Sequence, residues 1–170
     1  EKIARLQRNE IPIYEPGLEP MVERNQAEGR LTFTTDIGAA VRGAKVIFIA
    51  VGTPPGEDGS ADLQHVLGVA REIGRHMNEP KIVVTKSTVP VGTGRRLQQL
   101  FAKLRPDLVI EVASNPEFLR EGAAIDDFMR PDRVVIGTTD SRATNLLLEL
   151  YAPFTRTGAP IMVMDCASAE

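Results

Sequence analysis

The chain has 170 residues, of which 42% are hydrophobic and 25% charged, and its formal net charge is −3 at pH 7. This length and balance suit one compact globular domain with a hydrophobic core. The charge is dispersed, which argues against a nucleic-acid surface, and no apolar run approaches the ~20 residues that a membrane span needs. The first residues also lack the apolar core of a signal peptide, so we expect a cytoplasmic protein without nucleic-acid or membrane partners.

Cysteine and histidine are too few and too scattered for disulfide or metal chemistry. The single cysteine, Cys166, excludes an internal disulfide and a zinc site built from several cysteines. The two histidines, His65 and His76, are isolated in the sequence and add no metal-binding signature, so we expect no metal site.

Helical and strand patterns alternate along the chain. The first pattern is a helix over residues 2–9, with no strand before it. Apolar runs rich in β-branched residues then predict strands at residues 45–51, 81–85, 109–113, 133–138 and 161–164. Apolar residues at helical spacing predict helices over residues 61–77, 95–104 and 143–151. Residues 168–170 look like the first turn of another helix.

This alternation predicts an α/β fold with a Rossmann-like, doubly wound and mainly parallel sheet. The strand runs are almost continuously apolar, which is typical of parallel strands with both faces buried. Such folds usually open with a strand and a G-x-G-x-x-G turn, and neither precedes the first helix of this sequence. We therefore expect a sheet that lacks the usual first strand and glycine-rich turn, which would leave a strand edge unpaired.

Ligands of open α/β sheets bind outside the carboxyl ends of the strands, so the residues that follow each strand run are candidates. Gly52, Thr53 and Pro54 follow the first run, within an expected surface loop over residues 52–59. Gly52 permits close backbone approach and Thr53 adds a hydroxyl, whereas a plain turn explains the composition equally well.

Lys86, Ser87 and Thr88 follow the second run and bring a cation and two hydroxyls to one strand end. Gly92 and Thr93 then start the next helix, whose free amides favour an anion. A simple helix cap at Thr93 is the plainer interpretation, but it does not explain the Lys-Ser-Thr cluster.

The third run is followed by an acidic segment in which Glu117 and Glu121 are four residues apart. One helical turn would place both carboxylates on one face, where like charges raise at least one pKa and suit acid–base chemistry. The competing interpretation is a solvated helix start with acids near the positive end of the helix dipole.

Five segments in collinear order resemble the UDP-glucose/GDP-mannose dehydrogenase family. They are IYEPGLE (13–19), IAVGTPPGEDGSADL (49–63), KSTVPVGT (86–93), SNPEFLREGAAIDDF (114–128) and RPDRVVIG (130–137). Residues 121–125 and 130–133 are more similar to the UDP-glucose branch than to the GDP-mannose branch or the UDP-N-acetylmannosamine 6-dehydrogenases. The resemblance implies that residues 1–170 are part of an N-terminal NAD-binding domain. It also implies that residues 166–170 begin the helix leading to central and C-terminal domains.

The resemblance implies two successive oxidations of the C6 alcohol of a nucleotide sugar, which in this branch is UDP-glucose. Two NAD molecules are reduced, a cysteine captures the aldehyde, and a thioester is hydrolysed to the uronate. The full-length parent is expected to be a homo-oligomer.

Specific residues match functional positions of that family. The implied cofactor-binding residues are Lys2, Val51, Gly52, Thr53, Pro54, Ser87, Thr88 and Glu121. The implied sugar-binding residues are Glu117, Phe118, Leu119, Arg120 and Glu121. Glu117 matches the base that activates the hydrolytic water, and Thr88 and Glu121 complete the implied catalytic set. Lys2 matches a lysine near the adenosine ribose.

Parts of the family pattern lie outside this sequence. The glycine fingerprint would precede Glu1, and the catalytic Lys, Asn and Gly-Gly-Ser-Cys-Phe segment would follow Glu170, so we expect the chain alone to be inactive. Cys166 lacks glycine-rich surroundings and is interpreted as a structural cysteine. Two alternatives stay open, namely another nucleotide sugar such as GDP-mannose, and a non-catalytic nucleotide-binding module, against which the acidic pair argues.

Overall fold

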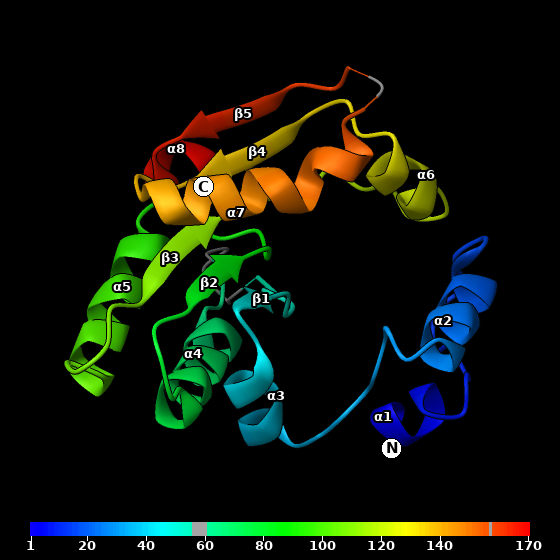
Figure 1. Ribbon diagram of the computed structural model, residues 1–170, viewed down its shortest axis with the longest axis horizontal. Helices are drawn as coiled ribbons and strands as arrows, with labels where there is room; N and C mark the ends of the chain where they lie inside the picture. The colour runs from blue at the N-terminus through cyan, green and yellow to red at the C-terminus, as the bar shows by residue number, and fades with distance from the viewer. Residues whose placement is uncertain (56–60, 157) are drawn as a thin grey trace.

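Three helices precede five strands that alternate with further helices (Figure 1). The computed structural model describes residues 1–55, 61–156 and 158–170. The helices are α1 (Lys2–Leu6), α2 (Leu18–Ala27), α3 (Ile37–Gly43), α4 (Gln64–His76), α5 (Thr93–Leu104), α6 (Ala124–Met129), α7 (Ser141–Tyr151) and α8 (Cys166–Ala169), with a 3-10 helix η1 (Ala152–Phe154). The strands are β1 (Val46–Ile49), β2 (Ile82–Thr85), β3 (Glu111–Ser114), β4 (Val134–Gly137) and β5 (Ile161–Met164).

Every strand and helix predicted from the sequence is present, with ends shifted by a few residues. The helical turn expected at the C-terminal end is also present, as α8. The helices α2, α3 and α6 were not predicted. The expected surface loop over residues 52–59 is described as far as Pro55, and its residues 56–59 lie outside the described part. None of the described helices is long and apolar enough to cross a membrane.

The strands form one sheet whose spatial order, β1-β2-β3-β4-β5, follows the chain. Pairing is parallel between β1 and β2, between β2 and β3, and between β4 and β5. The strands β3 and β4 instead meet in an antiparallel contact at Ser114 and Gly137. The predicted Rossmann-like, mainly parallel α/β fold is confirmed, with one antiparallel junction that the apolar pattern did not indicate.

Helices cover both faces of this sheet. On one face, Val83 of β2 belongs to a buried cluster with α4 and α5, including Ile73 and Phe101. On the other face, Val84 belongs to a second cluster with α7, including Leu147. Successive side chains of a strand point to opposite faces, so a continuously apolar strand supplies both clusters. Each fully buried large side chain contributes roughly 1.5–3 kcal/mol to folding.

The prediction that both faces of each strand are buried is confirmed for β2 and β4. It is wrong for β1 and β5, the strands at the two edges of the sheet. All residues of β2 and β4 are buried. Phe48 of β1 is 37% exposed, and Met162 and Val163 of β5 are 44% and 47% exposed. The reason is that each end strand has only one neighbouring strand among the described residues, and fewer elements cover its side chains.

A buried lysine ties the start of β2 to the end of α3. Lys81 is 2% exposed, and its ammonium donates hydrogen bonds to the carbonyl of Ala44 at 2.6 Å and to that of Arg42 at 3.3 Å. The Glu79 carboxylate accepts a third bond at 3.0 Å. The lysine therefore satisfies carbonyls at a helix C-terminus, where a positive charge is also favourable.

Replacing Lys81 with methionine keeps the apolar stem but leaves these part-buried carbonyls without their donor. We expect the free energy of unfolding to fall by ~1–3 kcal/mol, the usual cost of an unsatisfied buried group. Chemical denaturation measures this change. The matched control is Lys103→Met, which removes an exposed lysine of α5 and should change stability by less than ~0.5 kcal/mol. Equal effects of the two substitutions would contradict the assigned role.

Candidate active site

The loops that follow β1 and β2 are joined at the carboxyl edge of the sheet. The amides of Lys86 and Ser87 donate to the carbonyl of Ile49 at 2.8 and 3.2 Å. The Ser87 hydroxyl donates to the carbonyl of Val51 at 2.6 Å, and the Thr53 hydroxyl donates to the carbonyl of Thr88 at 2.9 Å. Two of the hydroxyls expected from the sequence therefore hold these loops against each other.

The backbone at Gly52 is not crowded by neighbouring atoms. A Cβ built at this position would meet nothing within 4 Å, and its φ is not in the left-handed region. Neither crowding by the described residues nor backbone strain therefore requires glycine at position 52. The open space leaves room for a ligand to approach the backbone at this strand end. Thr88, on the neighbouring loop, is exposed.

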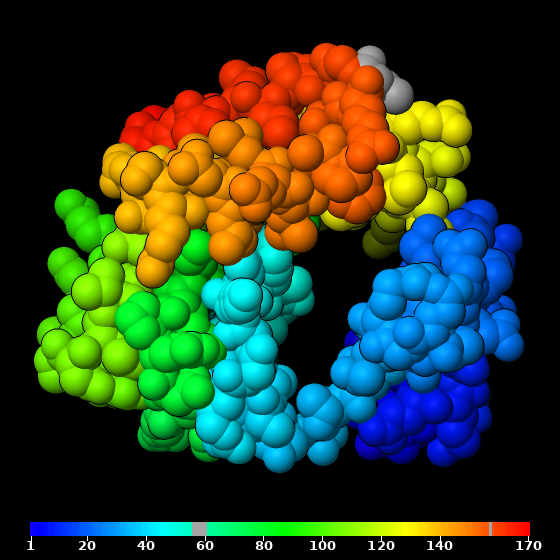
Figure 2. All heavy atoms as spheres, in the orientation of Figure 1, coloured from blue at the N-terminus to red at the C-terminus, as the bar shows by residue number. Residues whose placement is uncertain are grey.

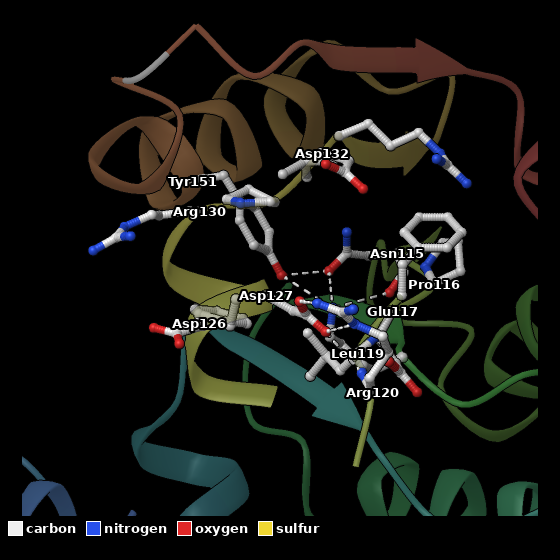
Figure 3. Close-up of a pocket in the computed structure, with 16 residues that line it drawn as sticks. Asn115, Pro116, Glu117, Leu119, Arg120, Asp126, Asp127, Arg130, Asp132 and Tyr151 are labelled. Carbon is white, nitrogen blue, oxygen red and sulfur yellow. Dashed lines mark hydrogen bonds and ion pairs between the residues drawn. The ribbon is translucent and has the colours of Figure 1, made fainter. Parts of the chain in front are cut away.

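A buried polar network links the ends of β2 and β3 to α7 (Figure 3). The Asn115 amide oxygen accepts hydrogen bonds from the Tyr151 hydroxyl at 2.5 Å and from the Lys86 ammonium at 3.2 Å. Its amide nitrogen donates to the carbonyl of Val135 at 2.7 Å. Burial lowers the pKa of Lys86, and the nearby Glu117 carboxylate partly offsets this effect. Burial also raises the pKa of Tyr151.

A pocket of about 510 Å³ lies beside this network and is lined by the acidic segment. Its lining includes Lys86, Asn115, the segment from Pro116 to Arg120, residues of α6 and of the loop after it, and Tyr151. The structure thus brings together four of the five expected sugar-binding residues, Glu117, Phe118, Leu119 and Arg120. Glu121 is not part of the lining, and among the described residues the pocket shares only Lys86 with the loops after β1 and β2.

The helical turn expected between Glu117 and Glu121 is wrong. Residues 115–120 form no helix, residues 121–123 form a turn, and α6 begins at Ala124. The Glu117 carboxylate accepts a hydrogen bond from its own loop, at the amide of Leu119 at 2.5 Å. Gly122 has a φ of 81°, which breaks a right-handed helix. The two carboxylates are therefore exposed on a loop and do not share a helix face.

Two cations fix side chains of the acidic segment. The Arg120 guanidinium donates to both carboxylate oxygens of Asp127, at 3.0 and 2.7 Å. These hydrogen bonds, with one from the amide of Arg120, lower the pKa of Asp127 to about 2. The Arg133 guanidinium lies 4.2 Å from the centre of the Phe118 ring. The segment that lines the pocket is thus held by contacts to α6 and to the start of β4.

A carboxylate of the chain itself occupies the amide end of α5. The Glu170 carboxylate accepts hydrogen bonds from the amides of Gly92 at 2.6 Å and Gly94 at 2.5 Å. The expectation of a Thr93 cap is wrong, because Gly92 is the cap residue and the Thr93 hydroxyl donates to the carbonyl of Pro90. The anion expected at these amides is therefore a carboxylate of the chain itself.

Cys166 has the properties of a structural cysteine. It is half-buried in α8, and burial, helped by the Glu170 carboxylate, raises the pKa of its thiol to about 11. A protonated thiol is a poor nucleophile near neutral pH. Its sulfur also packs so closely on Gly94 that a side chain at position 94 would collide with it.

Lys2 lies apart from the strand-end loops. It is exposed on α1, which forms with α2 a lobe that is separate from the sheet and approaches it beside α6 (Figures 1 and 2). Figure 2 shows an opening between this lobe and the segment that carries α3 and β1. The helix that carries Lys2 therefore lies apart from β1 and β2 (Figure 1).

The NAD-binding domain model of the UDP-glucose/GDP-mannose dehydrogenase family matches residues 1–155. The chain belongs to this family.

Curated relatives and solved structures of the family cover the chain almost completely. It is 51% identical to a UDP-glucose 6-dehydrogenase from Pseudomonas aeruginosa, over 100% of the chain and 38% of that protein. It is 49% identical to one from Rhizobium meliloti, over 99% of the chain and 39% of that protein.

Among solved structures, a UDP-glucose dehydrogenase from Pyrobaculum islandicum matches with a TM-score of 0.91 and 44% identity, over 98% of this chain and 39% of that one. A GDP-mannose dehydrogenase from Pseudomonas aeruginosa matches with a TM-score of 0.92 and 38% identity, over 99% and 39%. The chain thus spans less than two fifths of the length of these family members.

Sequence reasoning missed the polar network of Asn115 and Tyr151. Asn115 directly follows a strand, which is a usable signal, but its partner Tyr151 is 36 residues away on another helix. Nothing in local spacing identifies that pairing. The network matters because it holds Lys86 in the lining of the pocket.

We expect the Lys86 ammonium to titrate below 10.5, because burial disfavours its charged form. NMR of the lysine side-chain nitrogens measures this titration, and Lys86→Met identifies the signal. The unfolded chain then binds more protons than the folded chain just below pH 10.5, so the free energy of unfolding contributed by Lys86 rises with pH in that window. Titration of Lys86 at or above 10.5 would contradict this account.

Proposed function

We propose that this chain supplies the NAD-binding part of a UDP-glucose 6-dehydrogenase, which oxidises UDP-glucose to UDP-glucuronate. The observation that carries the proposal is the convergence of three loops. The segment containing Glu117 lines a pocket at the end of β3, while the loops at Gly52 and Ser87 occupy the ends of the two neighbouring parallel strands. Support for the substrate comes from the relatives named UDP-glucose 6-dehydrogenase.

The proposed reaction converts a C6 alcohol to a carboxylate in two oxidations and consumes one water. Bound NAD supplies the hydride acceptor for both oxidations. In the proposal, a cysteine of the parent protein outside residues 1–170 holds the carbonyl carbon as a thioester between the second oxidation and hydrolysis. The residues of this chain bind the reactants, orient them and move protons.

The residues divide between cofactor and sugar. We assign the dinucleotide to the backbone of Val51, Gly52, Thr53 and Pro54, to Ser87 and Thr88, and to Lys2 at the ribose. The sugar is assigned to Glu117, Phe118, Leu119 and Arg120, whose pocket is a mixed polar and apolar surface. Glu121 is assigned to both ligands.

Thr88 and Glu117 receive distinct chemical roles. The exposed Thr88 hydroxyl is at a strand end and positions the water or the sugar. The Glu117 carboxylate accepts a proton from the water that attacks the thioester, because it lines the pocket and faces the cationic Lys86.

Substrate choice is tested by turnover of the parent protein with several nucleotide sugars. We expect UDP-glucose to give the highest kcat/KM. A preference for GDP-mannose would assign the parent to the GDP-mannose branch of the family. Binding of nucleotide without turnover of any sugar would indicate a non-catalytic binding module.

Purified residues 1–170 should not oxidise UDP-glucose. The proposed nucleophile lies outside this chain, and covalent catalysis requires both a thiol and its activation. The absorbance of NADH measures turnover, with the parent protein as the positive control. Clear UDP-glucose-dependent NADH formation by residues 1–170 would contradict the proposal.

Replacing Glu117 with glutamine in the parent should block thioester hydrolysis. The amide keeps shape and hydrogen bonding but cannot accept the proton, and losing a general base typically costs ~100- to 10,000-fold in rate. We expect a burst of NADH followed by a covalent adduct on the cysteine, which intact-protein mass spectrometry detects after mixing with UDP-glucose and NAD.

Two further variants separate this role from general damage. Thr88→Ala should slow turnover without adduct, because its hydroxyl only positions water or sugar. Glu149→Gln, at an exposed position of α7, should leave turnover unchanged. Normal turnover by Glu117→Gln, or a stall with neither burst nor adduct, would transfer the role to Glu121.

A further inference from the structure

A carboxylate from the N-terminal lobe accepts backbone hydrogen bonds from the end of the loop between β3 and α6. This loop, residues 115–123, contains the acidic segment and is called the acidic loop below. Glu15 lies in the segment before α2 and is half-buried. Its two carboxylate oxygens accept hydrogen bonds from the amides of Gly122 and Ala124, each at 2.8 Å. These partners are 107 and 109 residues away along the chain, so the contact is a tertiary one. Charged acceptors form the stronger class of protein hydrogen bonds.

The hydrogen bonds to Glu15 are one of two restraints on the backbone beside Glu121. On its N-terminal side, the amide of Arg120 donates to the Asp127 carboxylate at 2.9 Å. On its C-terminal side, Gly122 is held by Glu15 and has a φ of 81°, which fixes the direction of the turn. The backbone on both sides of the exposed Glu121 is therefore bound by carboxylates, one local and one from a distant part of the chain.

The same contact joins two parts of the proposed cofactor site. The lobe of α1 and α2 carries Lys2 and approaches α6 (Figure 1). Glu15, in the segment before α2, accepts a hydrogen bond from Ala124, the first residue of α6. Packing supports the hydrogen bonds, because a Cβ built on Gly17 would lie 3.6 Å from the Ile125 side chain of α6. Any displacement of the lobe relative to the acidic loop must break these bonds.

We propose that Glu15 is a positioning residue that couples the Lys2-bearing lobe to Glu121 and thereby sets the affinity for NAD. The inference rests on the proposed function, because it uses the assignment of Lys2 and Glu121 to the dinucleotide. The sugar side of the acidic loop is held separately, by Asp127 and Arg133. Loss of Glu15 therefore acts mainly on the cofactor, because four of the five assigned sugar residues, Glu117 to Arg120, keep their restraints and Glu121 is the one shared residue affected.

The test uses Glu15→Gln in the parent protein. Glutamine keeps the size of the side chain but replaces one acceptor by a donor that faces an amide. We expect the Kd and KM for NAD to rise about ten-fold, the effect of losing one charge-assisted hydrogen bond, and the KM for UDP-glucose to change less than about two-fold. Glu19→Gln, at an exposed position of α2, is the matched control and should change neither.

Hydrogen–deuterium exchange gives a readout that does not depend on turnover. In Glu15→Gln the amides of residues 121–124 should exchange faster, while those of residues 117–120, β2 and β4 keep their protection. The proposal is overturned if the loop exchanges normally, if exchange rises throughout the sheet, or if the KM values for NAD and UDP-glucose rise together. If the wild-type parent does not oxidise UDP-glucose, the proposed function fails while a local change in exchange still supports the coupling.

Discussion

The candidate site depends on the parallel, in-register pairing of β1, β2 and β3. This pairing continues past the strand ends, where the amide of Lys86 donates to Ile49 and the amide of Asn115 donates to Thr85. Three loops that are far apart in the sequence therefore leave the sheet at one edge, as ligand-binding loops of open α/β sheets do. A register shift of one residue would turn Lys86 to the opposite face and separate it from the pocket.

Internal carboxylates determine the shape of the loops at this edge. Asp127, Glu15 and Glu170 each accept hydrogen bonds from backbone amides that regular secondary structure leaves unpaired. Such charge-assisted bonds are directional, so they hold a loop in one conformation without extending a helix. The acidic segment is consequently restrained by contacts from α6 and from the N-terminal lobe, and its own carboxylates at Glu117 and Glu121 remain exposed.

The sequence predicts the features of this protein that arise from local patterns. The strands and α4, α5 and α7 follow from apolar periodicity, and α3 could have been recognised from Asp36, which caps it by accepting from the amide of Ala39. Residue spacing predicts a helical turn at Glu117. Spacing alone does not reveal that a side chain distant in the sequence accepts hydrogen bonds from the amides of the turn that follows. The pairing of Asn115 with Tyr151 is equally non-local, since the two residues are brought together only by the packing of α7 on the sheet.

The most direct test of the account is a crystal structure of the parent protein with NAD and UDP-glucose bound. The account predicts that the dinucleotide lies on the backbone at Gly52 to Pro54, with the nicotinamide near Thr88 and the sugar in the pocket lined by Glu117. A dinucleotide bound away from both strand-end loops, or a sugar outside the Glu117 pocket, would contradict it.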